Sequence, residues 1–283
     1  MGNGSSIELE TEASALQTPA EVSQGLSVAY HERKDVRSIV DPALNQLRPE
    51  TVIIVPAYRE PDGIRLTLTE INGNLNGAKL LAVVRDDGDE TLHYASALAS
   101  DTIIQNSKGK GKAFTEALRH IRNNGGPPSN VVLIDADGTY PADRIDAMLR
   151  ILRERPEVGM VLGNRFGVPN GNRYAIFNPY YVGNRLLAMA HRMLNGFGLE
   201  DPLTGLRAIR YSLIDGWEPR AKGFDLEAEL NHRIASEGGS IFEIPVTYRH
   251  RVGEKKLRIH HGFGILLRML RCFDRGHLFH RSG

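Results

Sequence analysis

The sequence predicts an α/β fold in which a mostly parallel, Rossmann-like sheet is flanked by helices. Two observations support this prediction. Apolar strands alternate with segments of helical periodicity, which is typical of βαβ units. The strands are also almost continuously apolar, as expected when both faces of a sheet are covered. The expected strands are 51–55, 80–84, 101–104 and 130–134, and the expected helices are 63–72, 89–99, 110–122 and 141–153.

The pattern changes after a further apolar segment, Val158–Gly163. Strands and helices no longer alternate regularly, and we expect a substrate-specific second half that shares one sheet with the first. Its segments are a Gly-, Asn- and Pro-rich stretch (167–179), an amphipathic helix (Tyr180–Leu194), a turn-rich segment (Leu199–Arg207), a helix (Asp225–Glu237), a strand (Ser240–Tyr248) and a helical pattern (Ile259–Phe273).

Three regions follow from this pattern. Residues 1–48 are polar and lack sustained periodicity, so they predict a flexible N-terminal extension. Residues 49–258 form the α/β domain. Residues 259–283 form a basic segment with apolar residues at helical spacing, which predicts an amphipathic C-terminal helix.

Composition excludes several classes of protein. The chain has 283 residues, 41% of them hydrophobic, which is enough to bury a large core and excludes disorder throughout. Cys272 is the only cysteine, so a disulfide scaffold is excluded and a cytoplasmic location is expected. We find neither a signal peptide nor an apolar run near the roughly 18 residues of a membrane span. The first six residues match the spacing for N-myristoylation of Gly2.

The net charge of +1 hides a strongly basic C-terminal end. Residues 249–283 carry nine basic and two acidic side chains, which indicates contact with an anionic partner or a solvated basic tail. The apolar residues of 259–273 would let this segment lie at a membrane surface or pack on the protein itself. A nucleic-acid binder is disfavoured because the segment has few aromatic residues for stacking.

Polar clusters follow three of the expected strands. Ligands of open α/β sheets bind beyond the carboxyl ends of the strands, so these clusters are candidate site residues. Asp86 and Asp87 form one acidic pair, and Asp135 and Asp137 form another. Residues i and i+2 of an extended segment point the same way, so Asp135 and Asp137 can face one cation. Because neighbouring carboxylates repel, we expect Mg²⁺ or Mn²⁺ at this pair.

A lysine- and glycine-rich loop, Ser107–Lys112, opens the third helix. It does not match a Walker loop, because Asn106 and Ala113 stand where that motif needs Gly and Ser or Thr. We expect a basic loop near a nucleotide, with Lys112 as the best single candidate because helix N-termini favour anions.

The order of these motifs resembles family 2 glycosyltransferases with the glycosyltransferase A fold. The segments that resemble the family are Val55–Glu60, Asp86–Gly88, Gly109–Ala113 and Asp135–Asp137. The second half is similar to the dolichol-phosphate mannosyltransferase group in Gly163–Phe166, Asp201–Ala208, Glu243–Val246 and Arg251–Leu257, although that group usually has Ser in place of Lys255.

The resemblance implies roles for individual residues. Those for the nucleotide sugar are Pro56, Tyr58, Glu60, Asp86, Asp87, Lys112, Asp135, Ala136 and Asp137, of which Asp135 and Asp137 would hold the metal. Arg165, Arg185 and Arg251 would surround the acceptor phosphate and the leaving diphosphate. The residues expected to act in the reaction are Asp137, Arg165, Asp201 and Arg251. Thr139 stands where a third metal ligand can occur.

These features favour an inverting, metal-dependent transferase that moves a hexose, with mannose from GDP-mannose preferred, onto a polyprenyl phosphate such as dolichyl phosphate. Such an acceptor is already ionised and needs no general base. A hydroxyl acceptor would need one, and Asp201 is the candidate, with turn capping before Pro202 as the alternative. A UDP-sugar donor, a soluble acceptor such as 3-phosphoglycerate, and an inactive nucleotide-sugar-binding scaffold remain open. The lipid acceptor would bring the protein to the cytoplasmic membrane face.

Overall fold

The computed structural model describes residues 51–75, 78–124, 126–167, 185, 188–189, 192–193, 198–253 and 265–268. Two compact units divide the chain, Met1–Pro42 and Ala43–Gly283, and every described residue belongs to the second. The N-terminal extension, the lipidation pattern at Gly2 and most of the predicted helices 180–194 and 259–273 therefore lie outside the described residues.

The described residues form one seven-stranded sheet with the order β3-β2-β1-β4-β6-β5-β7. All neighbouring strands pair in parallel except for β6, which is antiparallel to both β4 and β5. The strands are β1 (Thr51–Ala57), β2 (Lys79–Val84), β3 (Asp101–Ile104), β4 (Asn130–Leu133), β5 (Val158–Asn164), β6 (Arg207–Arg210) and β7 (Ser240–Pro245). The predicted α/β fold with a mostly parallel sheet is confirmed.

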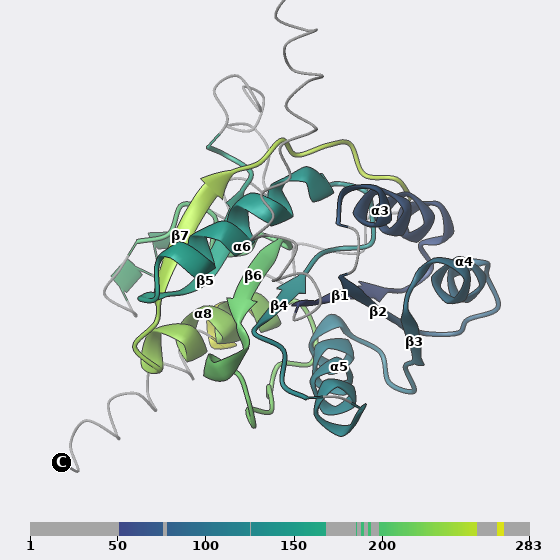
Figure 1. Ribbon diagram of the computed structural model, residues 1–283, viewed down its shortest axis with the longest axis horizontal. Coiled ribbons are helices and arrows are strands. Elements are labelled where there is room, and N and C mark those ends of the chain that lie inside the picture. Colours follow the sequence, from purple (N-terminus) through teal and green to yellow (C-terminus); the bar gives the residue numbers. More distant parts are fainter. Residues whose placement is uncertain are drawn as a thin grey trace, which may run out of the picture. The chain divides into compact units, whose positions relative to one another are not determined.

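Helices cover both faces of the sheet (Figure 1). One core packs α3 (Pro61–Asn74), α4 (Thr91–Leu98) and α6 (Ile145–Glu154) against one face. The other core packs α5 (Lys110–Asn124) and α8 (Leu226–Ser236) against the opposite face. Successive side chains of β1 alternate between the two cores, with Ile53 in the first and Ile54 in the second, and both are fully buried. This burial on both faces explains why the strands are almost continuously apolar.

The second half joins the sheet of the first half, as predicted, but with one strand that the sequence pattern did not indicate. Strand β6 has only four residues and lies within and just after the segment expected to be turn-rich. It begins with Arg207, a charged residue that is fully buried in the structure. A short segment that starts with a buried arginine lacks the apolar pattern by which the other strands were found.

The described part of the C-terminal segment packs on the domain. Ile265 is buried against Ala228, next to Leu203 and Phe224. Arg268 donates to Asp225 Oδ2 over 2.8 Å. For residues 265–268 the structure thus shows packing on the protein itself, one of the two expected alternatives. None of the described helices is both long and apolar enough to cross a bilayer.

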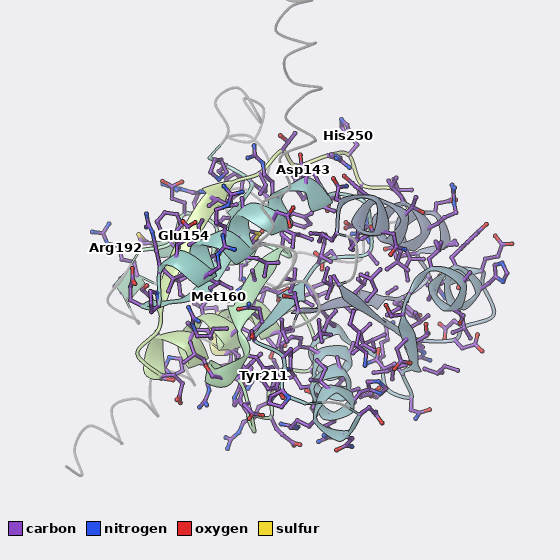
Figure 2. The ribbon with its side chains drawn as sticks, viewed as in Figure 1. Asp143, Glu154, Met160, Arg192, Tyr211 and His250 are labelled. Atoms are coloured by element: carbon purple, nitrogen blue, oxygen red, sulfur yellow. The ribbon has the colours of Figure 1, made fainter. Side chains whose placement is uncertain are left out.

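Side-chain positions follow the same division between core and surface (Figure 2). Met160 of β5 is fully buried in the core between the sheet and α8. Arg192 and His250 are exposed. The segment that carries His250 crosses the chain after β4, because the Arg249 amide donates to the Thr139 carbonyl and the Val252 amide to the Asp137 carbonyl. Residues 249–252 therefore lie next to the chain that follows the carboxyl end of β4.

Candidate active site

The polar clusters identified in the sequence meet at one edge of the sheet. Strands β1, β2 and β4 are parallel, so their carboxyl ends lie side by side. The chain turns sharply there, because Arg59 adopts a φ of 49° directly after β1. The start of α3 lies against the loop after β4, since a Cβ on Gly63 would collide with the Ala136 carbonyl oxygen. Close approach of these segments is possible only because residue 63 is glycine.

Asp135 is held by a lysine that the sequence argument did not select. Lys110 Nζ lies 2.5 Å from Asp135 Oδ1 and 2.5 Å from Glu227 Oε1. The Lys110 side chain is 9% exposed, and burial by itself would lower its pKa. The two carboxylates outweigh burial and raise the pKa of Lys110 above its ordinary value, so this ammonium stays charged. Gly205 leaves room for Asp135, because a Cβ there would collide with Asp135 Oδ2.

Asp137 is buried and bound from two sides. The amide and hydroxyl of Thr139 donate to its Oδ1 over 3.1 and 2.5 Å, and Arg251 donates to its Oδ2 over 2.7 Å. Arg251 also forms an ion pair with Glu60. Burial and the nearby negative charge of Asp135 raise the pKa of Asp137, and the bonds from Thr139 and Arg251 oppose that shift. Arg251 thus joins the end of β1 to the end of β4.

The two aspartates fit a hard divalent cation. The negative charge of Asp135 raises the pKa of Asp137, and a cation between such carboxylates relieves the repulsion. The Asp135 side chain is 31% exposed, so a ligand can reach it. Among the described residues we find no group of three or more His, Cys, Asp or Glu side chains placed to hold a metal. A pair of carboxylates of which one is accessible matches Mg²⁺ or Mn²⁺ bound by one or two carboxylates and completed by substrate phosphates and water.

The ends of β1 and β2 form a second polar cluster around Tyr58 and Asp87. Arg59 and Arg85 donate to Asp87 over 3.1 and 2.8 Å. A hydrogen bond from Tyr58, together with Arg85, lowers the pKa of Asp87 despite the opposing effect of burial. Lys108 lies over the Tyr58 ring, with its Nζ 4.9 Å from the ring centre. The aromatic ring and the ionised carboxylate are suited to the base and the ribose hydroxyls of a nucleotide.

The remaining residues predicted for the nucleotide sugar lie close to these two clusters. Pro56 is half-buried within β1, and the Asp86 side chain is exposed and accepts a bond from the Gly88 amide. Ala136 is buried between the two aspartates. The predicted residues after β1, β2 and β4 therefore share one edge of the sheet, as their order in the sequence suggested.

Arg165 and Asp201 form a bidentate pair at the end of β5. Arg165 Nε and Nη2 donate to Asp201 over 2.7 and 2.6 Å, and the Arg165 amide donates to the same carboxylate. Asp201 is fully buried, whereas the Arg165 side chain is 20% exposed. Burial works to lower the pKa of Arg165, but Asp201 outweighs it and raises that pKa well above the ordinary value. The geometry favours Asp201 as the residue that positions Arg165.

A buried network that the sequence argument missed supports this pair. Glu243 accepts bonds from the Glu200 and Asp201 amides, each over 2.8 Å. The Tyr140 hydroxyl accepts the Gly205 amide over 2.7 Å. Arg207 donates to the carbonyls of Pro202 and Thr204 over 2.6 and 2.9 Å. These bonds fix the backbone of residues 200–205, which contacts Arg165 on one side and Asp135 on the other.

Two predicted residues lie apart from these clusters. Lys112 lines a cavity between α5 and the segment Pro219–Lys222. Arg185 is exposed and helical, and its neighbours in the chain are outside the described residues, so its acceptor role stays a prediction. Residues two apart on a helix point to nearly opposite sides, so only one of Lys110 and Lys112 can face Asp135, but the sequence does not show which one.

Comparison with known proteins identifies the family. Residues 52–214 match the family described as Glycosyl transferase family 2. The chain belongs to glycosyl transferase family 2. This match spans β1 to β6 and so includes both aspartates and the Arg165–Asp201 pair. The prediction of a glycosyltransferase is confirmed.

Curated relatives include members named for polyprenyl phosphate chemistry. Over 206 residues the chain is 30% identical to Glycosyltransferase AglJ of Haloferax volcanii, covering 72% of this chain and 64% of that protein, which is less than two thirds of its length. It is 29% identical over 214 residues to a Dolichyl-phosphate hexose transferase of the same organism, covering 74% of this chain and 86% of that protein. The predicted resemblance to this group is confirmed.

Solved structures confirm the fold. Glucosyl-3-phosphoglycerate synthase from Mycobacterium tuberculosis, solved with Mn²⁺, UDP and glucosyl-3-phosphoglycerate, superposes with a TM-score of 0.63 at 18% identity and 82% coverage of both chains. The same enzyme has been solved with Mg²⁺ and UDP, with a TM-score of 0.62 at 17% identity, covering 82% of this chain and 83% of that one. At this identity the likeness concerns the architecture alone.

Proposed function

We propose that the chain transfers a hexose from a nucleoside diphosphate sugar to a polyprenyl phosphate, with GDP-mannose as the favoured donor. One observation carries the proposal: the acidic pair Asp135 and Asp137 shares a sheet edge with the Tyr58–Asp87 cluster. A site with both features can bind the base and ribose of a nucleoside diphosphate at one end and its diphosphate at the other. The names of the polyprenyl-phosphate relatives support the acceptor class.

The donor half of the site would hold and neutralise the diphosphate. Asp135 and Asp137 would bind a divalent cation, which when bound would offset the negative charge that develops on the leaving phosphate. Lys110 keeps its charge beside Asp135 and fixes the orientation of that carboxylate. Arg251 holds Asp137 and Glu60 in the same way. The chain thus preorganises both carboxylates before the substrate arrives.

The acceptor half would use Arg165, whose planar guanidinium is held in place by Asp201. A polyprenyl phosphate oxygen is already ionised, so it can attack the anomeric carbon directly while the bond from that carbon to the diphosphate breaks. No proton has to be removed, and a buried, bidentately bound Asp201 is consistent with a reaction that needs no general base. We propose positioning of Arg165 as the role of Asp201.

Transfer assays on the full chain test this proposal. GDP-mannose, UDP-glucose and UDP-N-acetylglucosamine are supplied with Mn²⁺ or with a chelator, and each is paired with dolichyl phosphate in detergent or with 3-phosphoglycerate. We expect Mn²⁺-dependent transfer of mannose to the lipid phosphate. The test variant is Asp137→Asn, and its matched control is Asp143→Asn. The control makes the same change at an exposed aspartate six positions later in the chain.

The outcomes separate the alternatives. Transfer to 3-phosphoglycerate without detergent would replace the lipid acceptor with a soluble one. Full activity in chelator, or in Asp137→Asn, would contradict the metal assignment. Donor binding without transfer to either acceptor would favour a nucleotide-sugar-binding scaffold.

A further inference from the structure

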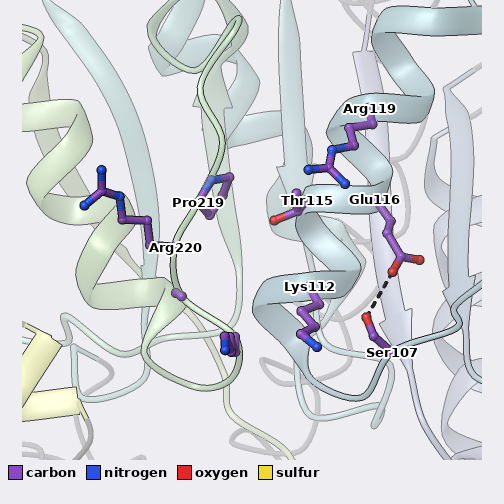
Figure 3. Close-up of a pocket in the computed structure, with 9 residues that line it drawn as sticks. Ser107, Lys112, Thr115, Glu116, Arg119, Pro219 and Arg220 are labelled. Carbon is purple, nitrogen blue, oxygen red and sulfur yellow. Dashed lines mark hydrogen bonds between the residues drawn. The ribbon is translucent and has the colours of Figure 1, made fainter.

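A cavity of about 290 Å³ lies between α5 and the segment Pro219–Lys222, outside the clusters described above (Figure 3). One wall carries Lys112, Thr115 and Arg119 of α5, and the other is the chain that leads into α8. This volume is close to the lower limit of small-molecule pockets, about 300 Å³, so the cavity suits a small ligand or one head group.

Both walls are held by backbone contacts. Gly109 and Gly111 lie directly against the Lys222 and Ala221 carbonyls, and a Cβ on either glycine would collide with them. Glu229 accepts bonds from the Arg220 and Ala221 amides over 2.9 and 2.6 Å. A cavity whose walls are fixed in this way exists before a ligand arrives, which lowers the cost of binding.

The charges that line the cavity are mostly positive. Lys112 and Lys222 line it, and neither forms an ion pair with another of the described residues. Arg119, which also lines it, is paired with Glu218 over 2.9 Å. Glu116 is the acidic residue of the lining and accepts a bond from Ser107 over 3.2 Å (Figure 3). Arg220 lines the cavity as well, so the cations of the lining outnumber its one carboxylate and favour an anion.

The cavity is separated from Asp135 by the first turn of α5. Lys110 points to Asp135, and Lys112 comes two residues later, about 200° further around the helix. Lys110 therefore contacts Asp135 at the sheet edge, whereas Lys112 lines the cavity. We propose that the cavity is a second anion site, which binds the phosphate group of a small ligand through Lys112 and Lys222.

Phosphate could come from a soluble compound or from a lipid head group, and the experiment has an arm for each. Inorganic phosphate is titrated into the full chain by calorimetry at low ionic strength and without divalent metal. Sedimentation with vesicles of phosphatidylcholine, with or without phosphatidate, forms the second arm. The variants are Lys222→Glu and Lys112→Glu. Lys79→Glu, at the start of β2, makes the same charge change away from the cavity and is the matched control.

We expect saturable binding that weakens about tenfold in each cavity variant and stays unchanged in Lys79→Glu. Binding of free phosphate identifies a soluble ligand, whereas binding of phosphatidate vesicles alone identifies a lipid head group. The proposal is overturned if neither probe binds, if all three variants weaken binding equally, or if saturating GDP with Mn²⁺ displaces the phosphate. None of these readouts depends on sugar transfer, so the result is independent of the proposed function.

Discussion

The two halves of the candidate active site hold their charges in different ways. In the donor half, Asp135 and Asp137 are each bound by a cation from a different part of the chain, Lys110 and Arg251. In the acceptor half, Asp201 is fully buried and is paired bidentately with Arg165. The donor half thus holds two carboxylates, each through a different cationic side chain, where a divalent cation and a diphosphate would bind. The acceptor half is a fixed frame that presents one guanidinium.

The largest effect is expected in the donor half. Asp137→Asn keeps the shape of the side chain but removes the charge that faces the expected cation, so transfer should fall about a thousandfold or more. Stability should change little or increase, because burial raises the pKa of Asp137 and its ionised form is costly in the folded state. Initial rates and chemical denaturation measure the two quantities. If the variant lost activity and was also clearly less stable to denaturation, Asp137 would have a structural role like that of Asp201.

Much of the donor half could be predicted from the sequence, because its carboxylates directly follow apolar strands whose ends must meet. Lys110 could not be selected, since Lys108, Lys110 and Lys112 alternate with other residues and only the start of α5 decides which one faces Asp135. The pairing of Arg165 with Asp201 joins residues 36 positions apart. Tyr140 and Arg207 act on backbone groups, and such contacts leave no local pattern in the sequence.

The acceptor half should respond chiefly through stability. Arg165→Leu leaves the buried Asp201 carboxylate without its cation, which should lower the free energy of unfolding by about 3–5 kcal/mol. The double variant Arg165→Leu/Asp201→Asn removes the uncompensated charge and keeps an acceptor for the amide of residue 165, so it should recover most of that loss while remaining inactive. Urea denaturation of both variants tests this. Additive losses would mean that the pair is not energetically coupled.

A smaller loss of activity is expected at Lys110. Lys110→Met leaves Asp135 and Glu227 facing each other without their shared cation, so the orientation of Asp135 should be lost and kcat should fall about a hundredfold. Lys79→Met, at the start of β2, is the control. If Lys110 acted only through fold stability, the double change Lys110→Met/Glu227→Gln would restore kcat together with the melting temperature. We expect it to restore the melting temperature alone.

The smallest effect concerns the pH dependence of the acceptor frame. Burial raises the pKa of Glu243 above its ordinary value of 4.5, against the opposing bonds from the Glu200 and Asp201 amides. The folded state then binds this proton more tightly than the unfolded state, so the contribution of Glu243 to stability is complete below about pH 4.5 and is lost as the pH rises through the folded pKa. Glu243→Gln removes the carboxyl that takes up the proton while keeping one acceptor oxygen. The difference in unfolding free energy between wild type and variant should therefore shift in favour of the variant from pH 4.5 upward. A difference that is flat across this range would show that the two amide bonds cancel the effect of burial on Glu243.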